Sequence, residues 1–185
     1  MTKLATLILL AFTAITANAG TVLIDFDDVT PQYISPGNLY DVETKGFTFD
    51  AITFAASPPE AGVSSAGIWA SADCFAWGGG CGSQIVMEAI SGSAFSIHSI
   101  ASWEGSFSGT LFGGGAADLS APIGTGDWLS LETFRVTNIC PSTPCGYWDA
   151  SLDDVTASVV PIPAAAWLFG SALAGLGWIG RKRVT

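Results

Sequence analysis

The apolar and polar residues in the central part of the chain alternate with a period of two. Residues 21–27, with the sequence TVLIDFD, place Val22, Ile24 and Phe26 on one face, which is typical of a strand with one buried side. Residues 46–54, with the sequence GFTFDAITF, are rich in the aromatic and β-branched types that favour strands. The same pattern predicts further strands at residues 67–71, 84–90, 95–103, 109–112, 128–139 and 147–159.

No helical pattern separates these strands. The intervals between them contain no amphipathic run of useful length, and Gly, Ser, Pro and Asp punctuate them throughout. Strands that follow one another without helices form antiparallel sandwiches or barrels. We therefore predict an all-β fold of about eight strands, a single jelly-roll-like antiparallel β-sandwich. Residues 31–44, 55–66 and 113–126 are expected to be loops or sheet edges.

The N-terminal end of the chain has a different, continuously apolar pattern. Residues 1–19 contain one early cation, Lys3, then an apolar stretch at residues 4–15 and an A-x-A site at residues 17–19. These are the parts of a secretory signal peptide, which signal peptidase removes during export. Residues 20–159 then remain before a second apolar stretch, enough for one domain with its own hydrophobic core.

The C-terminal end, residues 160–185, has the order of a membrane anchor. Pro161 and Pro163 precede residues 164–180, which carry no charge, and three consecutive cations follow. At ~1.5 Å per residue the uncharged run covers roughly 26 Å as a helix, near the lower limit for crossing a bilayer. The cations predict that the C-terminus stays in the cytoplasm, so that the preceding domain faces outward.

The same C-terminal residues resemble a known sorting signal. Residues 160–171, with the sequence VPIPAAAWLFGS, closely resemble the VPLPA type of the PEP-CTERM signal of Gram-negative bacteria, together with the apolar run and basic tail that follow. Ile162 stands where many members carry Glu, which matches one subtype. The positions that carry the resemblance are Val160, Pro161, Pro163, Trp167, Gly170, Arg181, Lys182 and Arg183.

The resemblance implies a route through the cell envelope. An exosortase in the inner membrane would recognise the tail and remove it near the proline motif, with release or attachment at the cell envelope, the outer surface or the extracellular matrix. Proteins of this kind often accompany exopolysaccharide in biofilms. The resemblance covers residues 160–185 alone and implies nothing about residues 20–159. The alternative is an ordinary C-terminal transmembrane anchor.

Charge limits the partners of the predicted domain. All 16 acidic residues of the chain lie in residues 20–159, whereas only Lys45 and Arg135 of the six cations do, which gives that segment a formal charge of −14. This charge opposes binding to nucleic acid and to anionic membrane surfaces, because both carry the same sign. Divalent cations and neutral or cation-bridged polysaccharide remain as partners. In the alternative interpretation the acids only keep an exported protein soluble.

Four cysteines form two close pairs in the sequence. Export to an oxidising compartment makes disulfides the expected state. Three connectivities are possible, and the spacing favours two local loops, around residues 75–80 and 141–144. A metal cluster is disfavoured because neither pair has the two-residue gap of a zinc knuckle and His98 is the only histidine. The expected pairs are Cys74 with Cys81 and Cys140 with Cys145.

Two acidic stretches lie at the ends of the predicted domain, at residues 25–30 and 152–156. Asp153 shares its parity with Val155, so it is predicted to point inward, where an unpaired charge costs several kcal/mol, roughly 3–5. Residues 152–155, LDDV, resemble a pattern of jelly-roll carbohydrate-binding modules, in which the terminal strands lie together and an Asp helps hold a structural Ca²⁺. The ligands that this resemblance implies, beside backbone carbonyls, are Asp153 with Asp25 or Asp27. In the alternative interpretation Asp153 accepts backbone hydrogen bonds and the other acids face solvent.

Tryptophans supply the other candidate site. Sugar-binding proteins use exposed tryptophan faces, but a domain of this size needs large side chains in its core, so most of the tryptophans are expected to be core or loop anchors. Trp77 is the exception, because it lies in a Gly-rich disulfide loop that cannot easily bury it. We therefore predict Trp77 as a ligand platform. The others in this part of the chain are Trp69, Trp103, Trp128 and Trp148.

Signs of catalysis are weak. His98 faces outward on its predicted strand, which does not suit a Ser-His-Asp triad, and neither a G-x-S-x-G nor an H-E-x-x-H motif occurs. Glu88, Glu104 and Glu132 could converge as a glycosidase pair, but solvated glutamates are the commoner explanation. We therefore expect an exported, non-catalytic binding or structural module associated with polysaccharide. The alternatives are an extracellular glycoside- or ester-active hydrolase and a purely structural component of the matrix.

Overall fold

The computed structural model describes residues 20–54, 58–74, 81–140 and 147–160 of the chain. These residues belong to one compact unit, Ala19–Val160. The predicted signal peptide and nearly all of the predicted sorting signal lie outside the described residues, so both stay predictions. Within the described ranges, no helix combines the length and the apolar character needed to cross a membrane.

The described residues form an all-β, antiparallel fold, as the alternation in the sequence predicts. A short 3-10 helix, η2 (Gly126–Leu129), precedes one of the strands. The strands are β1 (Val22–Ile24), β2 (Gln32–Ile34), β3 (Leu39–Thr44), β4 (Phe47–Phe54), β5 (Pro59–Ser64), β6 (Gly67–Asp73), β7 (Gly82–Ala89), β8 (Phe95–Glu104), β9 (Ser106–Leu111), β10 (Leu131–Ile139) and β11 (Tyr147–Val159).

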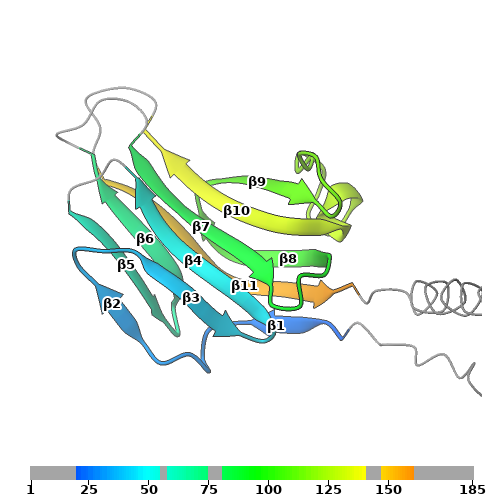
Figure 1. The fold of residues 1–185 in the computed structure, drawn as a ribbon, viewed down its shortest axis with the longest axis horizontal. Helices are drawn as coiled ribbons and strands as arrows, with labels where there is room; N and C mark the ends of the chain where they lie inside the picture. The colour runs from blue at the N-terminus through cyan, green and yellow to red at the C-terminus, as the bar shows by residue number, and fades with distance from the viewer. Residues whose placement is uncertain (1–19, 55–57, 75–80, 141–146, 161–185) are drawn as a thin grey trace, which may run out of the picture. The chain divides into compact units, whose positions relative to one another are not determined.

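The strands form one sheet in the order β2-β5-β6-β11-β8-β10-β7-β4-β3, with β1 beside β11 and β9 beside β10. A single residue pair, Leu131 opposite Phe95, joins β8 to β10. This narrow link divides the sheet into the β6 half (β1, β2, β5, β6, β8 and β11) and the β7 half (β3, β4, β7, β9 and β10). The sheet curves until it is nearly closed into a barrel (Figure 1). The finer designation, a jelly-roll-like sandwich, stays a prediction.

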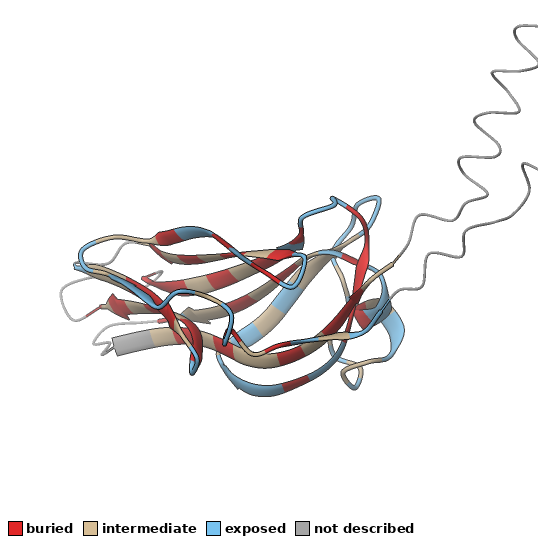
Figure 2. Ribbon diagram, turned by 90° about the horizontal axis from the view of Figure 1, so that it is seen from below, coloured by how far each residue is buried: buried red, intermediate tan, exposed pale blue. Residues whose placement is uncertain are grey.

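The core lies between the inner faces of the two halves. Buried and partly exposed residues alternate along most strands (Figure 2), and β4 shows the period of two without interruption. Phe47 and Phe49 of β4 are fully buried. The ring of Phe49 meets Phe26 at a centroid distance of 5.0 Å, and Phe47 meets Phe95 at 5.5 Å, both edge to face. Aromatic pairs of this geometry add to the stabilisation that burial provides.

Three strands fall in segments that the sequence predicts as loops or edges. β2 and β3 are the two ends of the sheet, so the edge alternative is confirmed for residues 31–44. β5 lies between β2 and β6, so the prediction for residues 55–66 is wrong there. The sequence of β5, PEAGVS, has little β-propensity, and hydrogen bonding to strands on both sides defines it. In β3, Asp41 has a left-handed φ of 53° and lies within a bulge between Leu39 and Val42, which conceals the alternation.

The other boundaries differ little from the prediction. Residues 112–125 connect β9 to η2 without a strand, apart from one isolated bridge at Ala116. The strand predicted from Trp128 begins at Leu131 instead. η2 occupies the preceding residues, and there the Trp128 Nε1–H donates to the Ala121 carbonyl oxygen at 3.0 Å. Trp128 is therefore a core anchor held by a helical turn.

Candidate functional site

The first and last strands of the sheet lie side by side, the arrangement that the Ca²⁺ hypothesis requires. β1 pairs with β11, and Ile24 lies opposite Val155. β11 pairs with β6 as far as Leu152 and has β1 as its neighbour from Val155 onward. Four carboxylates lie at this change of neighbour, two just after β1 and two on β11. We call them the acidic junction: Asp25, Asp27, Asp153 and Asp154.

The backbone at Asp154 decides how β11 presents its carboxylates. Asp154 has a left-handed φ of 52°, and Leu152 and Val155 on either side are both buried. Asp153 is partly buried, less than Leu152 and Val155, so it is not a core residue, and the prediction that it points inward stays a prediction. The left-handed residue breaks the alternation on which that prediction rests. Gly67 approaches here so closely that a Cβ would lie 2.7 Å from the Leu152 carbonyl oxygen and 2.8 Å from the Asp153 Cβ.

Burial raises the pKa of the Asp153 carboxyl above its ordinary value. A hydrogen bond from the Asp154 backbone lowers this pKa, and the charges of Asp154, Asp25 and Asp27 raise it. Asp25 and Asp27 therefore lie within electrostatic range of Asp153. One Asp153 oxygen, Oδ1, is buried and has no hydrogen-bond partner among the residues that the structure describes. A proton or a cation would relieve this unpaired carboxylate.

The donors of the acidic junction suit Ca²⁺ in kind, because this ion takes about 6–8 oxygen ligands. The unpaired Asp153 Oδ1 fits such an ion, since it needs a positive partner. In the part of the chain that the structure describes, however, no three His, Cys, Asp or Glu side chains form a group that could hold a metal. Backbone carbonyls and water would therefore supply most ligands, and calcium binding stays a prediction.

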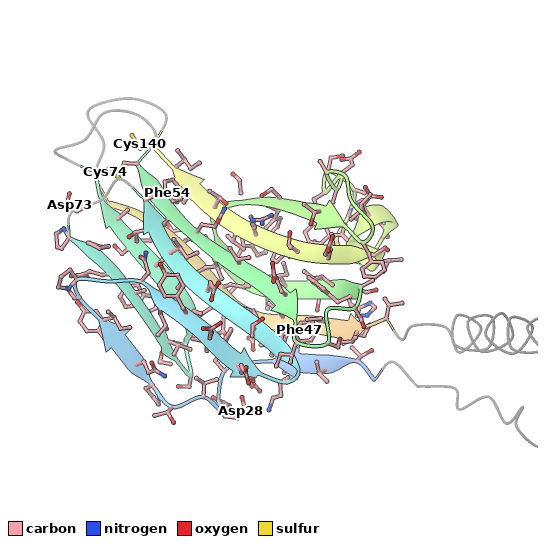
Figure 3. All side chains as sticks on the ribbon, viewed as in Figure 1. Asp28, Phe47, Phe54, Asp73, Cys74 and Cys140 are labelled. Atoms are coloured by element: carbon pink, nitrogen blue, oxygen red, sulfur yellow. A yellow bond between two sulfur atoms is a disulfide. The ribbon has the colours of Figure 1, made fainter. Side chains whose placement is uncertain are left out.

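The neighbouring acid, Asp28, is paired with a protein cation. Its carboxylate accepts a hydrogen bond from the Thr44 hydroxyl at 2.7 Å and meets the Lys45 Nζ at 3.1 Å. These two interactions hold the pKa of Asp28 below its usual range. Figure 3 shows Asp28 at the end of the sheet opposite Cys74 and Cys140.

The first of the two predicted disulfides is confirmed, since Cys74 and Cys81 are bonded. Cys140 is also disulfide-bonded, and its expected partner, Cys145, lies outside the described residues. The Cys140 backbone N–H donates to the Cys81 carbonyl oxygen at 2.9 Å, and both cysteines are buried. Trp77, the predicted ligand platform, lies outside the described residues too.

The other sequence candidates are on the surface. His98 is exposed, as expected, and its Nε2 lies 2.8 Å from the Ser158 Oγ. Glu88, Glu104 and Glu132 are exposed on three different strands, β7, β8 and β10.

Two of the tryptophans expected to be anchors differ in exposure. Trp128 is 1% exposed and Trp103 is 45% exposed, so of these two the anchor prediction holds for Trp128 only. The side chain of Trp148 lies outside the described part.

An aromatic pair lies on the outer face of the β6 half. In the strand register Tyr33 of β2 is opposite Gly62 of β5, which is opposite Trp69 of β6. The Trp69 indole covers Gly62 so closely that a Cβ there would lie 2.8 Å from three indole atoms. The centroids of the Tyr33 and Trp69 rings are 5.8 Å apart, and the Tyr33 side chain is 62% exposed. We call Tyr33 and Trp69 the aromatic pair.

A polar pocket lies beside the aromatic pair. Its volume is about 100 Å³, and it is lined by Pro58, Glu60, Ser71 and Asp73. Two of the lining residues, Ser71 and Asp73, share the outer face of β6 with Trp69, because buried alanines separate these partly exposed positions.

Sequence reasoning missed this face. Tyr33 falls in a segment that was expected to be a loop or edge, and Trp69 was grouped with the core tryptophans. The signal was present in β6, whose sequence GIWASAD alternates Trp69, Ser71 and Asp73 with Ile68 and two alanines. A tryptophan on the polar side of such a strand is a surface residue.

Comparisons with known proteins give no assignment: no family model, no curated protein and no solved structure matches this chain.

Proposed function

We propose that this chain is an exported, non-catalytic β-domain that binds polysaccharide at the cell envelope or in the extracellular matrix. The observation that carries the proposal is the aromatic pair beside the polar pocket on the outer face of the β6 half. Aromatic faces with a few adjacent polar groups suit a ligand that has both C–H faces and hydroxyls. The disulfide between Cys74 and Cys81 is compatible with export.

Binding is tested by electrophoresis in native gels that contain a soluble neutral polysaccharide. We expect hydroxyethylcellulose or galactomannan to retard the exported product of the full chain relative to a gel without polysaccharide. Serum albumin, which is also acidic, controls for slowing by the gel itself. If neither a neutral polysaccharide nor alginate retards the protein more than albumin, the binding function is wrong and a structural role in the matrix replaces it.

The sorting part of the proposal rests on the sequence of residues 160–185. An exosortase would remove this tail near Pro161 and Pro163, leaving the β-domain at the cell surface or free in the matrix. Mass spectrometry of the protein from cells and medium reports both termini. We expect chains that lack Met1 to Ala19 and end near the proline motif. Recovery of Arg181 to Thr185 on every exported molecule would contradict processing.

We include two finer features in the proposal: the jelly-roll-like sandwich designation and a structural Ca²⁺ at the acidic junction. Asp153, with Asp25 or Asp27, would hold the ion, which would neutralise the unpaired carboxylate and tie β1 to β11. A melting temperature that rises with Ca²⁺ and falls with EDTA in the wild type, but not in Asp153→Ala, is expected. A wild-type melting temperature indifferent to both additions would exclude the site.

An extracellular hydrolase is the second candidate, and one observation favours it. Two carboxylates, Glu60 and Asp73, line the same pocket, and glycosidases place a pair of carboxylates at the scissile bond. Release of reducing ends from the polysaccharides that the protein binds, abolished in Glu60→Gln, would establish this candidate. Binding without any release of reducing ends supports the non-catalytic module.

A further inference from the structure

We propose that the aromatic pair and the polar pocket together bind an uncharged pyranose residue, and that this face rejects uronic acids and other anionic sugars. This inference rests on the proposed function, which it deepens by naming the site and the class of sugar. Tyr33 and Trp69 would contact the C–H face of the ring, and Glu60, Ser71 and Asp73 would accept hydrogen bonds from its hydroxyls.

The backbone beneath Trp69 builds the aromatic surface. The absence of a side chain at Gly62 lets the indole lie against β5 instead of standing away from the sheet. Tyr33 then extends this surface across β5 to β2, with an angle of 37° between the two ring planes. The two rings lie on β2 and β6 with β5 between them, and the pairing of these strands holds the rings in place, which limits the entropy that binding costs.

The polar side of the site is rich in acceptors. Glu60 accepts the Ser35 hydroxyl at 2.9 Å through Oε1. Asp149 of β11 lies opposite Ser71, and its Oδ1 is buried with no hydrogen-bond partner in the described part of the chain. Carboxylates accept hydrogen bonds and donate none when ionised, so they suit a ligand that presents hydroxyl hydrogens.

Charge selects among sugars. Glu60, Asp73 and Asp149 all belong to this region of the β6 half, whereas both cations of the described residues, Lys45 and Arg135, belong to the β7 half. A uronate placed on the aromatic pair would be repelled by the nearby carboxylates without any adjacent cation to offset them. A neutral hexose meets no such repulsion.

The size of the pocket defines what enters it. A volume of about 100 Å³ is well below the roughly 300–1,000 Å³ of pockets that enclose a small molecule. We therefore infer that one substituent of the sugar enters the pocket while the ring lies on the aromatic pair. A site that holds one residue this way binds weakly, and retention in a matrix would depend on many sites or many chains acting together.

The test compares single variants of the exported product of the full chain in native gels. We expect Tyr33→Ala and Trp69→Ala each to raise the dissociation constant for hydroxyethylcellulose or galactomannan, measured from the retardation, by about tenfold or more. This is the effect of losing an aromatic side chain that contributes much of the binding energy. Tyr40→Ala, which removes a 55% exposed tyrosine from β3, is the matched control and should bind like the wild type. Alginate, a polyuronate, should not retard the wild type in EDTA.

The outcomes separate this inference from the proposed function. If Tyr33→Ala and Trp69→Ala bind like the wild type, the site is wrong while polysaccharide binding stands. If alginate retards the wild type more than the neutral polysaccharides do, the class of sugar is wrong. If none of them retards the wild type, both proposals fail. If Trp69→Ala does not fold, as circular dichroism would show, Tyr33→Ala decides, because its side chain lies on the surface of an edge strand.

Discussion

The two halves of the sheet differ in the size of the side chains with which β4 on one side and β5 and β6 on the other face each other across the core. In the β7 half the inner face carries large residues, among them Phe47, Phe49 and Met87. In the β6 half three buried alanines lie opposite one another in the register of β5, β6 and β11. We call them the alanine row: Ala61, Ala70 and Ala150. β4 contacts β5 and β6 across the core, so large side chains from one half pack toward small ones from the other.

This difference separates the aromatic side chains that stabilise the core from those that lie on the outer face, where they are available to a ligand. At the alanine row the β6 half contributes small side chains to the core, and on its outer face the same strands carry Tyr33 and Trp69. The same half contains the two buried carboxylate oxygens that lack a partner among the described residues, on Asp149 and Asp153 of β11. Large aromatic side chains outside the core and hydrogen-bond acceptors without partners contribute little to the stability of the fold. Together they indicate a surface with a role in binding.

The largest expected effect is in the β7 half. Phe49→Ala removes a fully buried ring and its contact with Phe26, so it should lower the free energy of unfolding by about 3–5 kcal/mol. Tyr33→Ala, which removes a ring from the outer face of the β6 half, should lower it by about 1 kcal/mol or less. Urea unfolding of both variants measures the difference. Equal losses would show that the outer aromatics support the fold as much as the inner ones.

A second experiment tests whether the core leaves no room for side chains larger than alanine in the alanine row. Ala70 is completely buried, so Ala70→Leu should force its neighbours apart and cost about 1–3 kcal/mol in urea unfolding. Ser71→Leu adds a leucine to the next position of β6, on the outer face, and should change stability by about 0.5 kcal/mol or less. If Ala70→Leu were as stable as the wild type, the β6 half would contain unfilled space and the comparison between the halves would fail.

The sequence predicts the strands well where their alternation is regular. All eight segments predicted as strands contain one, because residues such as those of β4 have a clear period of two. The strands outside those eight segments have irregular or weak patterns, with a left-handed residue at Asp41 in the edge strand β3 and few β-branched residues in β5, the strand that was missed. Their formation depends on pairing with neighbours, which a single segment does not reveal.

The candidate site is less predictable than the fold. The proximity of Asp25 and Asp27 to Asp153 was anticipated, because the first and last strands were expected to lie together. The partial burial of Asp153 was not, because the left-handed Asp154 interrupts the alternation along β11. The aromatic pair joins residues 36 positions apart in the sequence, and only the register of β2, β5 and β6 brings them together.

The smallest expected effect concerns the unpaired carboxylate of the β6 half. The pKa of Asp153 is raised in the folded protein, so protonation favours the folded state. This contribution is complete below the ordinary pKa of 3.8 and is lost as the pH rises through the raised folded value. Asp153→Asn cannot ionise, so in EDTA its melting temperature should match the wild type at low pH and exceed it slightly near neutrality.

Asp118→Asn is a control of opposite sign. Hydrogen bonds from Ser120 hold the pKa of Asp118 below its usual range, so its carboxylate stabilises the fold above pH 3.8, and this stabilisation is lost as the pH falls through the folded value. Asp118→Asn should therefore melt slightly below the wild type near neutrality. If Asp153→Asn melts below the wild type as well, the Asp153 carboxylate is paired in solution, as the Asp118 carboxylate is by Ser120.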